Sequence, residues 1–336
     1  MTLKPEDRAY QLVNGFRAAQ VVGGAVRLGI PDHLATGPMS VDGLSMETKI
    51  EAGRLRRLLR GLVALGVVAE QNDGRFSNTE VGELFREGVP GTRRLMALML
   101  IPESYRAWDH FMETLQTGVT GHSLAHGGTL WESLARDPDF AARFNAVMAS
   151  NSEEVARSVA TSGEFTHASV VIDVGGGKGA LVAGVMLDHP RLRGIVYDVP
   201  AGLAETSEYL AARGVADRCA IVEGDFFKSV PAGDVYLLKD ILHDWDDERA
   251  GAILAVCRAA MNPGARTMII ERVPPSHLSD DPVHLNFAMT DLQMMVQLGG
   301  RERTLEEYEP LFEGAGLKLD RFTPGGVYQL VEAVAV

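Results

Sequence analysis

An apolar run that ends in glycines, residues 170–179, constrains the fold of this chain more than any other segment. It reads Val-Val-Ile-Asp-Val-Gly-Gly-Gly-Lys-Gly. A short β-branched run is typical of a buried strand, and the following glycines let a ligand approach the backbone where a helix begins. The run therefore predicts a strand–loop–helix unit that binds a ligand at the carboxyl edge of a sheet.

The rest of the C-terminal half repeats this pattern. Short β-branched runs alternate with amphipathic segments, which is typical of a parallel sheet covered by helices. Strands are expected at 170–174, 194–198, 219–223, 234–238 and 265–271, and helices at 178–188, 201–213 and 247–260. A helix at 304–315 and strands at 317–322 and 327–335 follow. We therefore predict an α/β fold with a doubly wound, Rossmann-like sheet over residues 166–336.

The N-terminal half reads as helix almost throughout. The segment 10–28 is apolar nearly all round, so we expect it to be buried, against a second subunit. Helices at 41–48 and 51–65 precede a hairpin, 67–78, whose turn contains Asp-Gly. This order predicts a winged-helix-like domain over residues 1–100, followed by a helical region over 101–165.

The charge balance restricts the partners of the protein. The sequence has 45 acidic against 32 basic residues, a formal net charge of −13, which repels a phosphate backbone. Four arginines of the expected second short helix admit two interpretations, a DNA-reading face or a solvated, ion-paired face: Arg54, Arg56, Arg57 and Arg60. The acidic charge favours the second interpretation, and we expect no nucleic-acid partner.

Cysteine usage and hydropathy indicate the compartment. The two cysteines, Cys219 and Cys257, lie in apolar settings, so no disulfide framework is indicated and a reducing cytoplasm is expected. The apolar stretch 95–101 is too short to span a bilayer, so we expect no membrane partner.

His122 and His126 raise the possibility of a metal site. Their spacing could hold zinc on a helix, but a metalloprotease motif requires Glu after the first His, and here Ser123 follows it. Flanking glycines make a helix doubtful. We expect no metal and interpret these residues as loop or pocket-lining histidines.

Two acidic residues follow strands at the expected ligand edge. Asp198 lies 21 residues after Gly177 and is suited to accept hydrogen bonds from ribose hydroxyls, or else to cap a helix. Together with Gly175, Gly177 also fits a looser dinucleotide-binding pattern. Asp225 and Phe226 could hold the amino group and the face of adenine, which a nicotinamide dinucleotide site does not require. The alternative is a loop aspartate beside a core phenylalanine.

His243 follows the fourth strand and is a candidate general base. An ordinary pKa near 6.5 would leave it neutral at pH 7. Glu271, at the end of the fifth strand, and Glu302 could reach the same cleft and orient the imidazole. For Glu302 an exposed position beside a capping box formed by Thr304 and Glu307 remains an alternative.

Taken together, these motifs resemble the S-adenosylmethionine-dependent small-molecule O-methyltransferases, which include plant caffeate and acetylserotonin enzymes and bacterial antibiotic-tailoring enzymes. Asp-Val-Gly-Gly-Gly, Gly-Asp-Phe-Phe, Leu-His-Asp-Trp and Gly-Gly-Arg-Glu-Arg-Thr occur in the family's order along essentially the whole chain. The resemblance implies S-adenosyl-L-methionine as cofactor, no metal, and a homodimer formed through the N-terminal domain.

The resemblance also implies roles for individual residues. His243 would deprotonate a substrate hydroxyl, with Glu271 and Glu302 flanking it. The cofactor would be bound by Gly175, Gly177, Asp198, Asp225, Phe226 and Lys239.

The expected substrate is a hydroxylated aromatic secondary metabolite. Its pocket is expected to include residues that ordinary core packing would also explain: Trp108, Trp131, Met148, Asn286, Met289 and Asp291. Two other functions remain open. One is a family member that binds the cofactor but catalyses hydroxylation, decarboxylation or a pericyclic reaction, and the other is a ligand-sensing winged-helix regulator.

Overall fold

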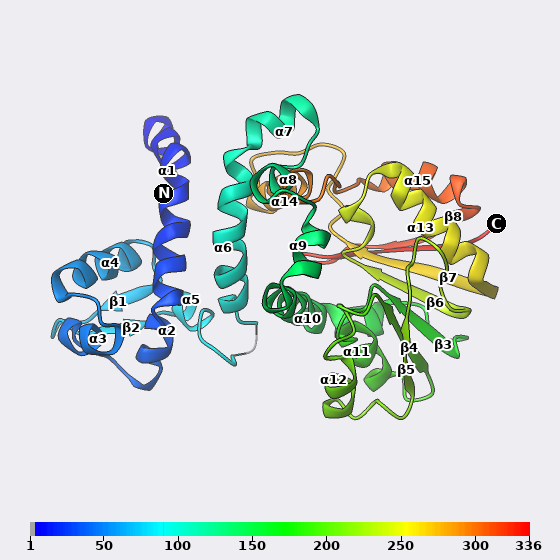
Figure 1. The fold of residues 1–336 in the computed structure, drawn as a ribbon, viewed down its shortest axis with the longest axis horizontal. Coiled ribbons are helices and arrows are strands. Elements are labelled where there is room, and N and C mark those ends of the chain that lie inside the picture. The colour runs from blue at the N-terminus through cyan, green and yellow to red at the C-terminus, as the bar shows by residue number, and fades with distance from the viewer. Residues whose placement is uncertain (1–3, 90) are drawn as a thin grey trace. The chain divides into compact units, whose positions relative to one another are not determined.

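The computed structural model describes residues 4–89 and 91–336, and the chain packs as two compact units (Figure 1). The first unit ends at Tyr105 and the second begins at Arg106. No helix of the described residues is long and apolar enough to cross a membrane.

The first unit consists of helices and a two-stranded hairpin. Its elements are α1 (Pro5–Arg27), α2 (Ile30–His33), α3 (Val41–Thr48), α4 (Ala52–Ala64), β1 (Val68–Glu70), β2 (Phe76–Asn78) and α5 (Glu80–Glu83). The apolar face of α4 packs into a core with Leu44 and Phe76, because Leu55, Leu59 and Leu62 recur at helical spacing. The predicted order of helix, helix and hairpin is confirmed.

In the single chain, the N-terminal part of α1 carries exposed apolar side chains. Val13 and Phe16 are 77% and 56% exposed, and Tyr10 and Leu12 are also exposed. The sequence pattern detected the apolar surface, but within one chain nothing covers it among the described residues.

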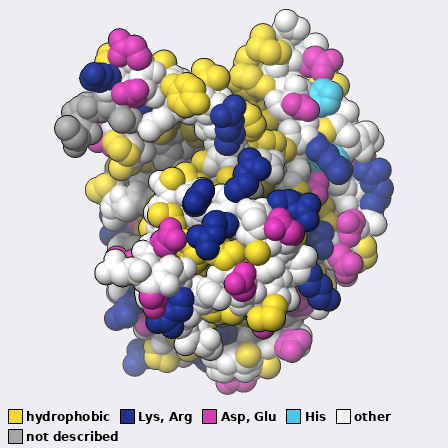
Figure 2. All heavy atoms as spheres, turned by 90° about the vertical axis from the view of Figure 1, so that its left-hand side faces the viewer, with side chains coloured by type: hydrophobic (Ala, Val, Ile, Leu, Met, Phe, Trp, Pro, Cys, Tyr) yellow, Lys and Arg dark blue, Asp and Glu magenta, His cyan; other side chains and the backbone are white. Residues whose placement is uncertain are grey.

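The arginines of α4 lie on the surface of the first unit. Lys and Arg side chains gather on the face drawn in Figure 2, with Asp and Glu side chains among them. Arg54 pairs with Glu51 at 3.6 Å and Arg56 with Glu70 at 3.8 Å. These contacts agree with a solvated, ion-paired helix face.

The helix α6 (Arg94–Asp109) begins in the first unit and ends in the second. It is followed by α7 (Phe111–Thr117), α8 (Gly121–His126), α9 (Leu130–Arg136) and α10 (Pro138–Ser162). The doubt about a helix at His122 was wrong, because the Thr120 hydroxyl caps α8 by accepting a hydrogen bond from the Ser123 N–H at 3.2 Å. His122 is buried, with Gln297 at 3.1 Å and Ser133 at 3.0 Å.

A mixed sheet forms the centre of the second unit. Its strands are β3 (Val170–Val174), β4 (Arg193–Asp198), β5 (Cys219–Glu223), β6 (Gly233–Lys239), β7 (Met261–Glu271), β8 (Leu317–Thr323) and β9 (Gln329–Ala335). The order is β5-β4-β3-β6-β7-β9-β8. The strands β3 to β7 pair in parallel, whereas β9 runs antiparallel to both β7 and β8. The predicted α/β sheet is confirmed, with an antiparallel edge added.

Helices cover both faces of this sheet. They are α10, α11 (Ala180–Asp188), α12 (Thr206–Ala212), α13 (Asp247–Ala260) and α15 (Leu305–Gly314), whereas α14 (Pro282–Gln297) packs against α7 and α8. Alternation along β3 sends Val171 into a core with α10 and α11, and Ile172 into a core with α13 and α15. The carboxyl ends of the parallel strands consequently bring their following loops to one edge of the sheet.

Candidate active site

The loop after β3 leaves room beside the backbone. Gly175 and Gly177 have φ angles of +67° and +54°, in the left-handed region that favours glycine. A Cβ on Gly175 would lie 2.5 Å from Ile241 Cδ1, whereas a Cβ on Gly177 would meet nothing within 4 Å. The loop is therefore closely packed at its start and open at Gly177.

Asp198, at the end of β4, contacts this loop. Its Oδ2 accepts the Gly177 N–H at 2.8 Å and its Oδ1 accepts the Val199 N–H at 2.7 Å. Burial raises the pKa of Asp198, and the two backbone N–H groups partly offset the rise. Two bonds leave further lone pairs on the carboxylate for a ligand.

The pair after β5 lies beside an aromatic cluster. Asp225 accepts the Phe227 N–H at 3.0 Å, and this bond together with Lys228 keeps its pKa below the ordinary value. The half-buried ring of Phe226 meets Trp245 edge-on at 6.4 Å. The ring of Trp131, on α9, stacks on the ring of Trp245, with 5.8 Å between the two ring centroids. One cluster thus joins the helical region to the strand edge.

Lys239 and Asp240 form a buried polar cluster at the end of β6. The Lys239 ammonium pairs with the Asp240 carboxylate, Arg272 contacts the same carboxylate at 3.2 Å, and the Tyr328 hydroxyl donates to it at 2.8 Å. Asp240 has a φ of +52°, which is unusual for a residue other than glycine. Burial opposes its ionised form, but Lys239, His243 and Arg272 hold the pKa of Asp240 well below its ordinary value.

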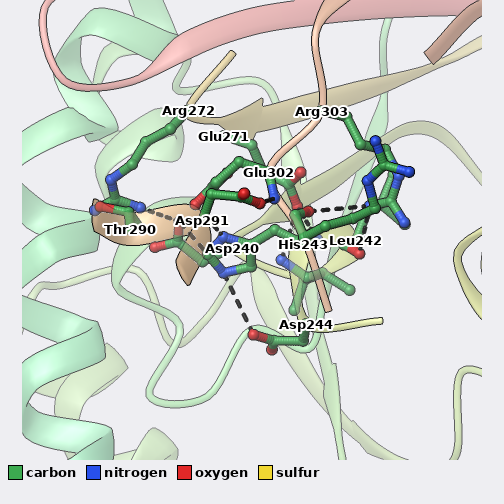
Figure 3. A network of polar contacts seen from close by, with 12 residues as sticks. Asp240, Leu242, His243, Asp244, Glu271, Arg272, Thr290, Asp291, Glu302 and Arg303 are labelled. Atoms are coloured by element: carbon green, nitrogen blue, oxygen red, sulfur yellow. Dashed lines mark hydrogen bonds and ion pairs between the residues drawn. The ribbon is translucent and has the colours of Figure 1, made fainter. Parts of the chain in front are cut away.

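His243 lies in the 3-10 turn Leu242–Asp244, with carboxylates near both ring nitrogens (Figure 3). Its Nδ1 is 2.9 Å from Glu302 Oε1, and its Nε2 is 3.4 Å from Asp244 and 3.9 Å from Asp240. Burial disfavours the cation, but Glu302, Asp244 and Asp240 outweigh it and raise the pKa of His243 to about 10. The expectation of an ordinary pKa and a neutral imidazole at pH 7 is therefore wrong for the free protein.

Glu302 is buried completely, so the exposed alternative is wrong. The capping box of Thr304 and Glu307 forms as well, one turn further along. The backbone N–H of Glu302 donates to Asp291 Oδ1 of α14 at 2.9 Å. Glu302 Oε2 has no hydrogen-bond partner among the described residues.

Glu271 contacts the backbone of the histidine segment rather than its ring. Its Oε1 accepts the N–H groups of Ile241 and His243 at 3.1 and 3.0 Å, and the Tyr308 hydroxyl donates to Oε2. Burial raises the pKa of Glu271, and nearby His243 partly offsets the rise. The expectation that Glu271 flanks the ring therefore differs from the observed contacts.

Arg303 was missed by the sequence reasoning. Its guanidinium is fully buried and donates to the carbonyl oxygens of Leu242 at 2.9 Å and Trp245 at 2.8 Å, and to Asp247 at 2.9 Å. No periodicity marks an arginine as buried. The only signal was its place in the Gly-Gly-Arg-Glu-Arg-Thr motif.

The expected substrate residues divide into two groups. Trp108 donates to Gln293 at 2.6 Å and stacks on Phe111, while Met148 is half-buried on α10. Asn286 and Met289 of α14 are exposed. The structure thus brings Asp291 to Glu302 and Trp131 to Trp245, but leaves two members of the set on the surface. Within 4–89 and 91–336, no group of three His, Cys, Asp or Glu residues could hold a metal.

Two family models match the chain. One is an O-methyltransferase domain over residues 108–318, and the other is an O-methyltransferase dimerisation domain over residues 10–88. The phenazine O-methyltransferase PhzM of Lysobacter antibioticus is 37% identical over 315 residues, which cover 94% of this chain and 91% of that protein.

Solved structures agree with this match. The crystal structure of LaPhzM has a TM-score of 0.93 and 35% identity, and the match covers 99% of this chain and 100% of that one. NcsB1, an O-methyltransferase from neocarzinostatin biosynthesis, was solved with S-adenosylmethionine and 2-hydroxy-5-methyl naphthoic acid. It has a TM-score of 0.82 and 29% identity, covering 95% of this chain and 96% of that one.

Proposed function

Because this chain belongs to the S-adenosylmethionine-dependent O-methyltransferase family, we propose that it methylates a phenolic hydroxyl of a small natural product. The observation that carries the proposal is the imidazole of His243. It lies at the ligand edge of the sheet with Glu302 on one ring nitrogen and Asp244 near the other. An acid–base group in this position suits a reaction in which a hydroxyl must lose its proton.

The residues at the strand ends fit the cofactor. S-adenosylmethionine supplies a methyl group carried on a sulfonium. Free space beside Gly177 and the remaining lone pairs of Asp198 suit the ribose, and the carboxylate of Asp225 with the ring of Phe226 suits adenine. Gly175 would line the methionine end. Lys239 would make a further contact from the cluster that now holds its ammonium.

His243 is proposed as the general base. A phenol has a pKa near that of tyrosine, about 10, so it is mostly neutral at pH 7 and a positioned base promotes its ionisation. The imidazole carries a proton in the free protein, so its neutral form must appear before it can accept the hydroxyl proton. Burial raises the pKa of Asp244 to about 7, and the carboxylate of Asp244 lies 3.4 Å from His243 Nε2.

The substrate is proposed to be a fused aromatic compound with a hydroxyl group. Two relatives support this class, since one is a phenazine O-methyltransferase and NcsB1 was solved with a naphthoic acid. The aromatic side chains of Trp108 and Trp131, with Met148, would contact the rings, and Asp291 would contact a polar substituent. Exposed Asn286 and Met289 would contribute only at the rim.

A homodimer is proposed as the functional assembly. The dimerisation-domain match covers α1 through α5, and the exposed apolar side chains of α1 support a second copy of this chain as the partner.

Two measurements test the proposal. Calorimetric titration with S-adenosylhomocysteine should give about one site per chain, whereas NADH should not bind. Mass spectrometry of reactions with a hydroxyphenazine and a dihydroxynaphthoic acid should then detect a gain of one methyl group. Cofactor binding combined with an added oxygen or a lost carboxyl group would instead support the non-methylating alternative.

A further inference from the structure

We infer that Arg303 is a positioning residue, which holds His243 by donating hydrogen bonds to the backbone of residues 240–245 while Glu271 accepts from the same segment. The inference rests on the proposed function. It assigns the buried arginine a role through His243 and not through direct contact with a substrate. The segment 240–245 joins β6 to α13 and lies outside both.

Glu271 provides the hydrogen-bond acceptor for two backbone N–H groups of this segment. Buried backbone N–H groups need partners, and outside a helix or sheet a side chain must provide them. One carboxylate oxygen of Glu271 accepts both the Ile241 and the His243 N–H. The Tyr308 hydroxyl donates to the other carboxylate oxygen and so helps to fix the orientation of the Glu271 carboxylate.

The backbone carbonyl oxygens of this segment accept hydrogen bonds from residues 301 and 303. Arg303 donates to the carbonyl oxygens of Leu242 and Trp245, and the backbone N–H of Arg301 donates to that of His243 at 2.9 Å. Gly300 packs so closely that a Cβ there would overlap the His243 carbonyl oxygen. Together, Glu271 and the 300–303 segment pair the backbone at His243 on both its N–H and its C=O.

The cost of this arrangement indicates that it is needed. Asp240 has a left-handed backbone, and such strain persists only where surrounding contacts over-determine the chain. Burying a guanidinium is also unfavourable, and its forked donors are retained where several acceptors must be fixed together. Arg303 also contacts the half-exposed carboxylate of Asp247, while its other donors serve the neutral carbonyl groups of Leu242 and Trp245.

The segment that contains Arg303 also affects the charge on the imidazole of His243. Glu302 directly precedes Arg303, so the same segment that holds the His243 backbone also delivers the carboxylate to Nδ1. If the segment moves, the contact between Glu302 and the ring lengthens. The pKa of His243 should then fall toward its ordinary value, in addition to any loss of alignment.

The main variant is Arg303→Lys, which keeps the positive charge but loses the planar set of guanidinium N–H donors. We expect kcat for the phenol to fall about 10- to 100-fold, since a displacement near 1 Å can have this effect, with KM values changed less than about threefold. The rising limb of kcat against pH should move to lower pH. Glu271→Gln keeps an acceptor oxygen for the two N–H groups, so it should lose less activity than Glu271→Ala.

Arg258→Lys provides the matched control. It removes bonds from another arginine to backbone carbonyl oxygens, those of Gly316 and Val336, near the C-terminal strands. It should keep the wild-type kcat and pH profile, even if the melting temperature falls.

A second readout needs no methyl acceptor. Nitrogen NMR of His243 in the complex with S-adenosylhomocysteine should show a cationic ring at pH 7.5 in the wild type and in the Arg258→Lys control. Arg303→Lys should titrate at lower pH.

The outcomes separate the two proposals. An unchanged titration and kcat in Arg303→Lys would overturn the positioning role, as would a loss of activity with an unchanged pH profile. If the wild type methylates no phenol, the proposed function fails, and the NMR titration still decides whether Arg303 acts on His243.

Discussion

The imidazole of His243 shows how neighbouring residues set the chemistry of a single side chain. An isolated histidine is neutral above pH 7, whereas Glu302, Asp244 and Asp240 hold this one as a cation. These carboxylates stabilise the imidazolium after proton transfer. Before the transfer, they lower the fraction of neutral imidazole that can act as the base. Both consequences can be measured.

Removal of the imidazole is the first test. His243→Ala should lower the methylation rate about 10²- to 10⁴-fold, the range for loss of a positioned base, while S-adenosylhomocysteine binds with nearly wild-type affinity. Product mass spectrometry and calorimetry measure the two quantities. Undiminished turnover would remove His243 from the mechanism.

The pH dependence follows from the raised pKa. Because the pKa of His243 is raised to about 10, the neutral base is scarce at pH 7, and kcat/KM should rise with pH toward that value. Glu302→Gln removes the nearest negative charge, so the pKa should fall and the rising limb should move to lower pH. A profile with the same midpoint in both proteins would show that Glu302 does not control the group.

At the scale of elements, the loop between β3 and α11 is the feature that most directly concerns the cofactor. Its backbone is left-handed at Gly175, Gly177 and Gly179, and space remains beside Gly177. A ligand can therefore approach the main chain there.

Gly177→Ala tests whether this space is used. The substitution should cost about 1 kcal/mol of stability because of the left-handed backbone, and should weaken S-adenosylhomocysteine binding roughly tenfold because the methyl group fills the space. The control is Gly74→Ala, because Gly74, in the hairpin turn, also has a positive φ, +79°, and a Cβ there would also meet nothing within 4 Å. It should cost similar stability without affecting binding, measured by thermal unfolding and calorimetry. Equal affinity in both variants would locate the cofactor elsewhere.

At the scale of the whole molecule, the exposed apolar face of α1 is the feature that supports the proposed homodimer. Contiguous exposed apolar side chains are uncommon on monomeric proteins and mark interfaces. Tyr10, Leu12, Val13 and Phe16 provide such a face.

Val13→Glu tests the proposed homodimer. A carboxylate buried in the interface would be strongly unfavourable, so size-exclusion chromatography with light scattering should show a dimer for the wild type and a monomer for the variant. Met46→Glu, which replaces another highly exposed apolar side chain of the first unit, should remain dimeric. A monomeric wild type would contradict the proposal.

Local patterns determined much of the fold. The apolar run 170–174 and the run 219–223 became β3 and β5 with the predicted bounds, because β-branched runs between turns specify strands locally. The Asp-Gly turn specified the β1–β2 hairpin. The motifs at the strand ends could also be recognised as candidate ligand-binding residues, because parallel strands place their carboxyl ends at one edge of the sheet whatever the packing around them.

The tertiary structure decided what those motifs contact. Glu302 and Glu271 lie 59 and 28 residues from His243, and only the packing of distant segments sends one carboxylate to the ring and the other to the backbone. Burial of Arg303 and the raised pKa of His243 depend on the same long-range contacts. The sequence by itself determined the elements and the residue types at the ligand edge. Charge state and orientation arose only when segments far apart in the chain shared a low-dielectric interior.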